Sequence, residues 1–217
     1  MDNIEKVIGK KIDFLFHLDS QLEEVLRQVE KPGRYIGGEV NSIRKSPEDV
    51  KVRMAFVFPD LYEIGMSYLG MQILYNTVNK KKELYCERVF APASDMEKLM
   101  REEKLPLFTL ETKTPVKEMD IVGFTLQYEM SFSTILNMLE LAEIPLIADE
   151  RGDEWPIIAA GGPCAFNPEP LADFVDIFLI GDGEILLPQV LELLGECKEK
   201  GRTKKDFLEK ACQLEGI

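Results

Sequence analysis

The stretch VRMAFVFPDLYEIG, residues 52–65, decides the fold because it joins a strand to a loop that begins a helix. Its first half, residues 52–58, is a nearly continuous apolar run, which is typical of a parallel strand that is buried on both faces. Its second half, DLYEIG at residues 60–65, places Asp60, Tyr62 and Gly65 in a short loop. Apolar residues at helical spacing then predict a helix over residues 66–79.

The same alternation of strand and helix continues along the chain. Apolar runs predict strands at residues 85–90, 121–126, 157–160 and 177–180, and an extended piece at residues 106–110. Helical spacing predicts helices at residues 94–102, 131–142 and 184–197. Because crossovers between parallel strands are right-handed, such units build a doubly wound sheet. We therefore expect an α/β fold, flavodoxin-like or Rossmann-like, with a mainly parallel sheet of five strands.

The first 50 residues precede this alternation. Apolar residues at helical spacing predict an amphipathic helix over residues 19–31, which Pro32 and Gly33 end. Residues 33–50 are rich in turn formers and contain two β-like stretches, at residues 35–36 and 39–43. We expect residues 1–50 to form an N-terminal helical appendage and a glycine-rich leader, residues 51–200 the α/β domain, and residues 201–217 the start of a linker.

Composition restricts the class of partner. The 217-residue chain has 39 acidic and 26 basic side chains, a formal net charge of −13, which argues against nucleic acid because polyanion binding needs clustered Lys and Arg. No stretch reaches the roughly 18 apolar residues of a membrane span, and the amino terminus lacks a signal-peptide core. The irregular, long spacings of the four cysteines predict reduced thiols. The expected compartment is the cytoplasm, with no membrane partner.

Four predicted loops meet at the carboxyl ends of the strands, where open α/β sheets bind ligands. They are residues 60–65, 125–129, 161–162 and 181–184. The candidate binding residues in these loops are Asp60, Tyr62, Gly65, Thr125, Gln127, Gly161, Gly162, Gly181, Gly183 and Glu184.

Each loop also has a purely structural interpretation. Asp60 can cap the following helix, and Gly161 and Gly162 can simply form a tight turn. The run GDGE at residues 181–184 is similar to a dinucleotide-binding fingerprint, but Leu186 stands where the third glycine is needed. The only histidine is His17, which excludes a His-bearing catalytic triad or a multi-His metal site in the α/β segment.

Taken together, YEIGMSYLGMQILYN, IVGFTLQYEMS and AAGGPCAFNPEPLADFVDIFLIGDGE resemble the amino-terminal, cobalamin-binding-like half of radical S-adenosylmethionine (SAM) proteins of the cobalamin-dependent type. The resemblance covers residues 52–197, and GRYIGGEVNSI is similar to the leader of an uncharacterised subgroup. In that family an Asp-x-His-x-x-Gly loop lies under the cobalt of cobalamin. A Ser-x-Leu after the third strand contacts the nucleotide tail, and a Gly-Gly after the fourth strand lets this tail pass.

Some positions match this pattern and others depart from it. The matching residues are Asp60, Gly65, Gly161 and Gly162. The departures are Tyr62 for His, Thr125 for Ser and Gln127 for Leu. A phenol with an ordinary pKa of about 10 is a poor cobalt ligand. The resemblance thus implies either cobalamin held without a protein ligand to cobalt, or a scaffold without the cofactor.

The catalytic half of that family reduces SAM with a 4Fe-4S cluster held by a Cys-x3-Cys-x2-Cys run. This chain contains no such run. We therefore expect the cluster and SAM to belong to a C-terminal domain that is missing here, through truncation, a split gene or expression of one domain. The expected partner is that catalytic domain, in cis or in trans, and the segment is not catalytic alone. The alternative is a cofactor-free module that docks a substrate or partner of the same enzyme.

Overall fold

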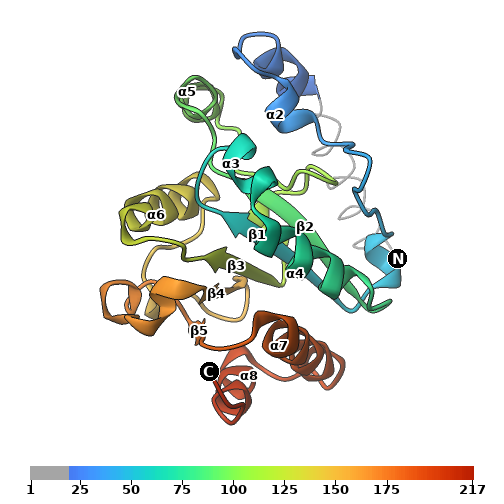
Figure 1. Ribbon diagram of the computed structural model, residues 1–217, viewed down its shortest axis with the longest axis vertical. Coiled ribbons are helices and arrows are strands. Elements are labelled where there is room, and N and C mark those ends of the chain that lie inside the picture. The colour runs from blue at the N-terminus through green and yellow to red at the C-terminus, as the bar shows by residue number, and fades with distance from the viewer. Residues whose placement is uncertain (1–19) are drawn as a thin grey trace, which may run out of the picture.

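The computed structural model describes residues 20–217 and contains one sheet of five strands, all parallel (Figure 1). The strand order is β2-β1-β3-β4-β5. Successive strands are added on one side of β1 and then on the other, so the order reverses between β1 and β3, which confirms the predicted doubly wound, flavodoxin-like sheet. The strands are β1 (Val52–Phe58), β2 (Leu84–Phe90), β3 (Ile121–Thr125), β4 (Ile157–Gly161) and β5 (Ile177–Leu179).

Helices cover both faces of the sheet (Figure 1). One face packs against α4 (Leu69–Asn79), α7 (Gly183–Glu199) and α8 (Lys204–Ala211), and the other against α5 (Ser94–Glu103) and α6 (Phe132–Leu141). There are two further short helices, α2 (Gly33–Ile36) and α3 (Tyr62–Ser67), and α3 packs Tyr62 and Met66 on the same apolar cluster as α4. Short 3-10 turns occupy residues 47–49, 116–118, 129–131, 148–150, 163–166 and 169–171. None of the helices in residues 20–217 is long and apolar enough to cross a membrane.

The N-terminal helix packs on α5 and joins the core. Residues 20–26 are helical, and Leu22, Val25 and Val29 are buried in the same apolar cluster as the inner face of α5. The helix ends at residue 26 rather than at the predicted residue 31. The reason is that Glu30 N donates to Asp95 Oδ2 of α5, at 2.8 Å, instead of to a helical carbonyl. The predicted start of this helix, and the position of His17, lie outside the described residues.

The β-like stretches predicted in the leader are wrong. Residues 35–36 belong to α2, and residues 39–43 form no strand. The leader backbone bonds to tyrosine side chains, since Ile43 N donates to Tyr75 Oη at 2.7 Å and Ile43 O accepts from Tyr85 Oη at 3.2 Å. Gly37 has a φ of +69°, and a Cβ there would overlap the carbonyl oxygen of Leu110. Side-chain contacts therefore shape this segment, where strand pairing was expected.

Two helices differ from those predicted. The single helix expected over residues 66–79 is two, α3 and α4, which meet at Tyr68. Tyr68 is extended (φ −81°, ψ 110°), and its ring lies 5.5 Å from that of Phe58. Helix α8 was not expected within residues 201–217. Thr203 and Asp206 form a capping box at its start, and Phe207 is buried against the sheet face that α7 covers.

A buried ion-pair network around Arg88 of β2 ties the leader to the sheet. Arg88 Nε donates to Glu111 Oε1 and its backbone N donates to Glu111 Oε2, both at 2.7 Å. Its Nη2 donates to Glu39 Oε2 at 2.8 Å and to Ser42 Oγ at 2.9 Å, while the guanidinium carbon lies 4.7 Å from the centre of the Tyr75 ring. Because β2 is an edge strand, Glu111 satisfies an N–H group that has no neighbouring strand to pair with.

We expect Arg88→Met to lower the free energy of unfolding by about 3–5 kcal/mol, because it leaves Glu111 buried without its cation. Urea unfolding checks this, and the double variant Arg88→Met/Glu111→Leu should recover most of the loss. The control Arg101→Met removes ion pairs in which Arg101 is 41% exposed, and should cost at most about 1 kcal/mol. Equal losses at Arg88 and Arg101 would contradict the importance of the buried network.

Candidate functional site

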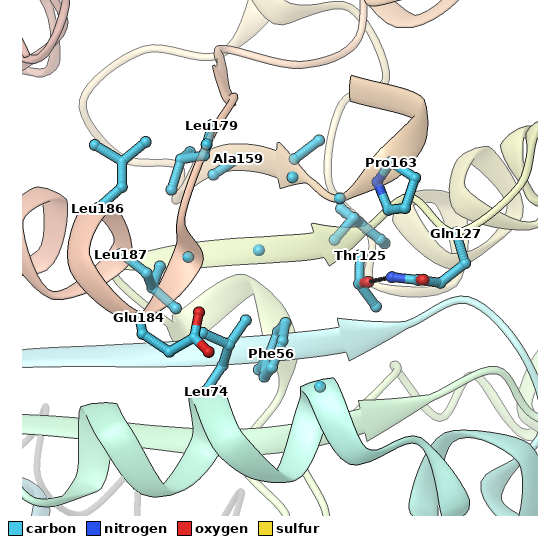
Figure 2. Close-up of a pocket in the computed structure, with 18 of the residues that line it drawn as sticks. Phe56, Leu74, Thr125, Gln127, Ala159, Pro163, Leu179, Glu184, Leu186 and Leu187 are labelled. Atoms are coloured by element: carbon cyan, nitrogen blue, oxygen red, sulfur yellow. Dashed lines mark hydrogen bonds between the residues drawn. The ribbon is translucent and has the colours of Figure 1, made fainter. Parts of the chain in front are cut away.

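A cavity of about 230 Å³ lies between the sheet and helices α4 and α7 (Figure 2). Its floor is formed by small residues on two adjacent strands, Gly123 of β3 and Ala159 and Gly161 of β4. Its walls include Leu74 of α4 and Leu187 of α7, and Figure 2 shows Thr125, Gln127 and Pro163 across the space from them. The hollow lies over floor residues that have almost no side chain, and the end of the Met54 side chain occupies the space next to Gly123.

Close packing of the two helices limits the cavity on the side away from the sheet. A Cβ at Gly183, the first residue of α7, would lie 3.2 Å from Leu74 Cδ2 of α4. Gly123 has a different role, since a Cβ there would overlap the end of the Met54 side chain, which crosses from β1. Met54 and Phe56 complete the apolar lining from β1.

Polar groups are confined to the mouth of the cavity. Gln127 Nε2 donates to Thr125 Oγ1, so these two side chains partly satisfy each other (Figure 2). Glu184 lies in the first turn of α7, where the helix dipole stabilises a carboxylate. The site is therefore an apolar slot with an amide and a hydroxyl on one side of its mouth and a carboxylate on the other.

The cavity brings together the predicted residues of three loops: Thr125, Gln127, Gly161, Gly162, Gly181, Gly183 and Glu184. The three predicted residues of the remaining loop, Asp60, Tyr62 and Gly65, do not line it. The site residues thus divide into those around the cavity and those in the loop after β1.

Residues of the loop after β1 make internal contacts. Tyr62 Oη donates to Glu39 Oε1 of the leader at 2.9 Å, and its ring packs edge-on at 5.3 Å from that of Phe90. Asp60 Oδ1 accepts from Leu61 N at 2.7 Å, and a Cβ at Gly65 would overlap the Phe90 ring. Tyr62 is thereby held toward the leader, away from the cavity.

Electrostatics keep the Tyr62 phenol neutral. Burial, together with the hydrogen bond to the Glu39 carboxylate, raises the pKa of Tyr62 to about 12. A neutral phenol that already donates to a carboxylate is not available as a metal ligand. In residues 20–217, moreover, no three His, Cys, Asp or Glu side chains are grouped so that they could hold a metal ion.

The Gly161-Gly162 turn packs its backbone against the end of β3. Leu126 N donates to Gly161 O at 2.7 Å, and Cys164 N donates to Leu126 O at 3.1 Å. Gly162 has a φ of +116°, and a Cβ there would lie 2.8 Å from Leu126 O. The second glycine is thus required by the backbone itself. In the same turn, burial, reinforced by Glu129, raises the pKa of the Cys164 thiol.

Residues 70–217 match the profile of a family described as radical SAM proteins, N-terminal. The chain belongs to this family. The match includes every strand except β1, all three cavity loops and helix α8, and it begins after the loop that contains Tyr62.

Among curated proteins, this radical SAM N-terminal chain is similar to an uncharacterized protein of Methanocaldococcus jannaschii, with 27% identity over 133 residues. The alignment covers 60% of this chain and 24% of the relative, so it spans about a quarter of that protein's length. No solved structure matches the chain significantly.

Two floor residues of the cavity, Gly123 and Ala159, and its leucine walls are not predicted from the sequence. Gly123 and Ala159 lie within apolar runs that predict strands, although a glycine inside a buried strand often marks a close approach of another group. Leu74 and Leu187 carry no local signal, because any amphipathic helix supplies leucines to the core.

We expect Gly162→Ala to lower the free energy of unfolding by about 1–3 kcal/mol, because alanine is strained at a φ of +116° and its Cβ would press on Leu126 O. Thermal or urea unfolding measures the change. The control Gly33→Ala, at a helical position with no atom within 4 Å of the added Cβ, should be neutral or slightly stabilising. A neutral Gly162→Ala would contradict the backbone requirement.

A pH dependence follows from Tyr62. Its folded pKa of about 12 exceeds the ordinary value of 10.0, so its contribution to stability is complete below about pH 10 and is lost as the pH rises to about 12. The free energy of unfolding of the wild type should therefore fall across that window, and that of Tyr62→Phe should fall less. Unfolding measured at several pH values, with phenolate absorbance to follow ionisation, tests this. Parallel curves for the two proteins would refute it.

Proposed function

We propose that this chain is the cobalamin-binding-like N-terminal module of a radical SAM enzyme. In this proposal the cavity holds the nucleotide tail of a corrinoid, no side chain of the module ligates cobalt, and the module is not catalytic by itself. The observation that carries the proposal is the slot floored by Gly123, Ala159 and Gly161, with Thr125 and Gly162 near its mouth.

The size and lining of the slot favour one planar ring system. Its volume of about 230 Å³ is below the roughly 300–1,000 Å³ of a pocket that encloses a whole drug-sized ligand. A bicyclic base of a nucleotide tail is flat and mostly apolar, which matches a floor of backbone and methyl groups. The larger corrin ring would have to lie outside the slot, over the loops at the carboxyl edge.

The residues present fit the tail and do not fit cobalt ligation. Tyr62 stands where the cobalamin-dependent proteins that the sequence resembles have the cobalt-ligating His, but its hydroxyl is bonded to Glu39 and stays neutral. The carboxylates of Asp182 and Glu184 at the start of α7 disfavour the phosphate of the tail, which limits the affinity to be expected.

In this proposal the module positions and shields a cofactor. When bound, a corrinoid would supply a cobalt centre for methyl or electron transfer. The residues of this chain would hold its tail in an apolar slot and exclude water from it. The cluster and SAM would be held elsewhere, because the chain has no Cys-x3-Cys-x2-Cys run.

A second candidate is a cofactor-free module that docks a substrate or partner of the same enzyme. The loop after β1 favours it, since Asp60, Tyr62 and Gly65 all make contacts within the chain. The two candidates differ in one measurable property, the binding of a corrinoid to the purified chain.

We expect the purified chain to bind hydroxocobalamin with one-to-one stoichiometry in calorimetry and visible spectroscopy. Ala159→Leu places a larger side chain in the slot and should weaken binding at least about tenfold. The control Ala172→Leu makes the same change at an exposed position and should bind like the wild type.

Tyr62→Phe should leave the affinity and the spectrum of the bound corrinoid unchanged, because the phenol is not a ligand. A spectral change in this variant would contradict that part of the proposal. Absence of any corrinoid binding by the wild type would refute the cofactor claim and leave the docking module as the function.

A further inference from the structure

Large apolar side chains are exposed close in sequence to residues that line the cavity. They lie on segments that follow four different strands, and all four segments are at the carboxyl edge of the sheet. Isolated exposed apolar residues are normal, but a group at one edge of the sheet marks an interaction surface. The members used here, called the rim, are Ile64, Leu69, Met130, Phe166 and Ile185, with exposed fractions from 48% to 80%.

The rim is also acidic. Residues 59–70, 126–132, 161–167 and 180–186 contain no Lys or Arg. Their acidic residues are Asp60, Glu63, Glu129, Asp182 and Glu184. Among residues 20–217, only Glu63 of this group forms an ion pair, with Arg34 and Lys31. The other four carboxylates therefore lie on the same segments as the apolar side chains and form no ion pair with a described residue.

The carboxyl-terminal residues run beside the rim. Ile180 N, just after β5, donates to Gly216 O at 2.7 Å, and a Cβ at Gly216 would lie 3.2 Å from Leu186 Cδ2. Figure 1 shows the C-terminus next to β5 and α7. A polypeptide joined at Ile217 would therefore start next to this surface, and the aligned part is only 24% of the length of the M. jannaschii relative.

We infer that the rim is the docking surface for the domain of the radical SAM protein that carries the iron–sulfur cluster. The matching face of that domain is apolar at its centre and basic around it, because interface cores exclude charge and the surrounding potentials of two partners are complementary. A second copy of this chain fits poorly, since two acidic rims repel each other. An anionic membrane surface is excluded by the same repulsion.

The inference rests on membership of the radical SAM family and not on corrinoid binding. The test needs the polypeptide that carries the Cys-x3-Cys-x2-Cys run, encoded either in frame after Ile217 or by an adjacent gene. Two variants report on the surface: Met130→Cys on the rim, where the side chain is 80% exposed, and Val40→Cys on the leader, where it is fully exposed. Labelling by a maleimide is followed by peptide mass spectrometry, which separates these positions from the exposed Cys212.

In the presence of the cluster-bearing domain, joined or separate, labelling at position 130 should slow at least about tenfold relative to the 217-residue chain alone. Labelling at position 40 should not change. Adding Leu69→Lys, or raising the salt concentration, should restore much of the labelling at position 130.

Equal rates at position 130 with and without the domain, or protection at position 40 instead, overturn the inference. So does protection at position 130 that depends only on the concentration of the chain itself, which would indicate a second copy. Absence of any polypeptide with the three-cysteine run from both genomic positions overturns it as well. Failure of hydroxocobalamin to bind leaves it unaffected, so the two proposals fail separately.

Discussion

The arrangement of the leader and of the loop after β1 depends on one requirement, that the buried guanidinium of Arg88 be paired with carboxylates. A cation on an edge strand that is removed from water has to be paired, and its carboxylates come from two distant segments, Glu111 after α5 and Glu39 in the leader. Glu39 in turn accepts the hydroxyl of Tyr62. The orientation of the loop after β1 is thus set by charge pairing at the edge of the sheet, and this pairing holds Tyr62 away from the cavity.

The second constraint is an asymmetry between the two faces of the sheet. On the face that α5 and α6 cover, β3 and β4 supply Val122, Phe124 and Ile158, and the space is filled. On the opposite face the same strands supply Ile121 and Ile157 at their amino ends but Gly123 and Ala159 further along, while α4 and α7 remain in close contact at Gly183. The end of the Met54 side chain fills the place of a Cβ at Gly123, and the slot remains beside it, between the small residues of the sheet and the two helices.

The strands and the convergence of three of the four loops on the cavity were predictable because both follow from local patterns, apolar runs and the residues that end them. The features that the sequence did not predict depend on contacts between distant residues. The first helix ends early because Asp95 binds Glu30, and Tyr62 turns away because of Glu39. The capping box of Thr203 and Asp206 was a local signal for α8 that could have been read. Of the cavity floor, the sequence predicted Gly161 as a binding residue, and Gly123 was visible only as a glycine within a buried strand.

The net charge of −13 is not spread evenly, because within residues 20–217 the carboxylates are paired with cations at one edge of the sheet and mostly unpaired at the other. At the amino ends of the strands the carboxylates are paired, Asp120 with Lys198 and Asp176 with both Arg151 and Lys204. At the carboxyl ends, four rim carboxylates have no such partner among the described residues, and they lie on the same segments as exposed apolar side chains. In the sequence the same acidic excess only argued against nucleic acid. The position of this acidic excess in the fold favours a partner with a basic face. Carboxylates that are unpaired beside an apolar surface are stabilised when a partner of opposite charge covers them.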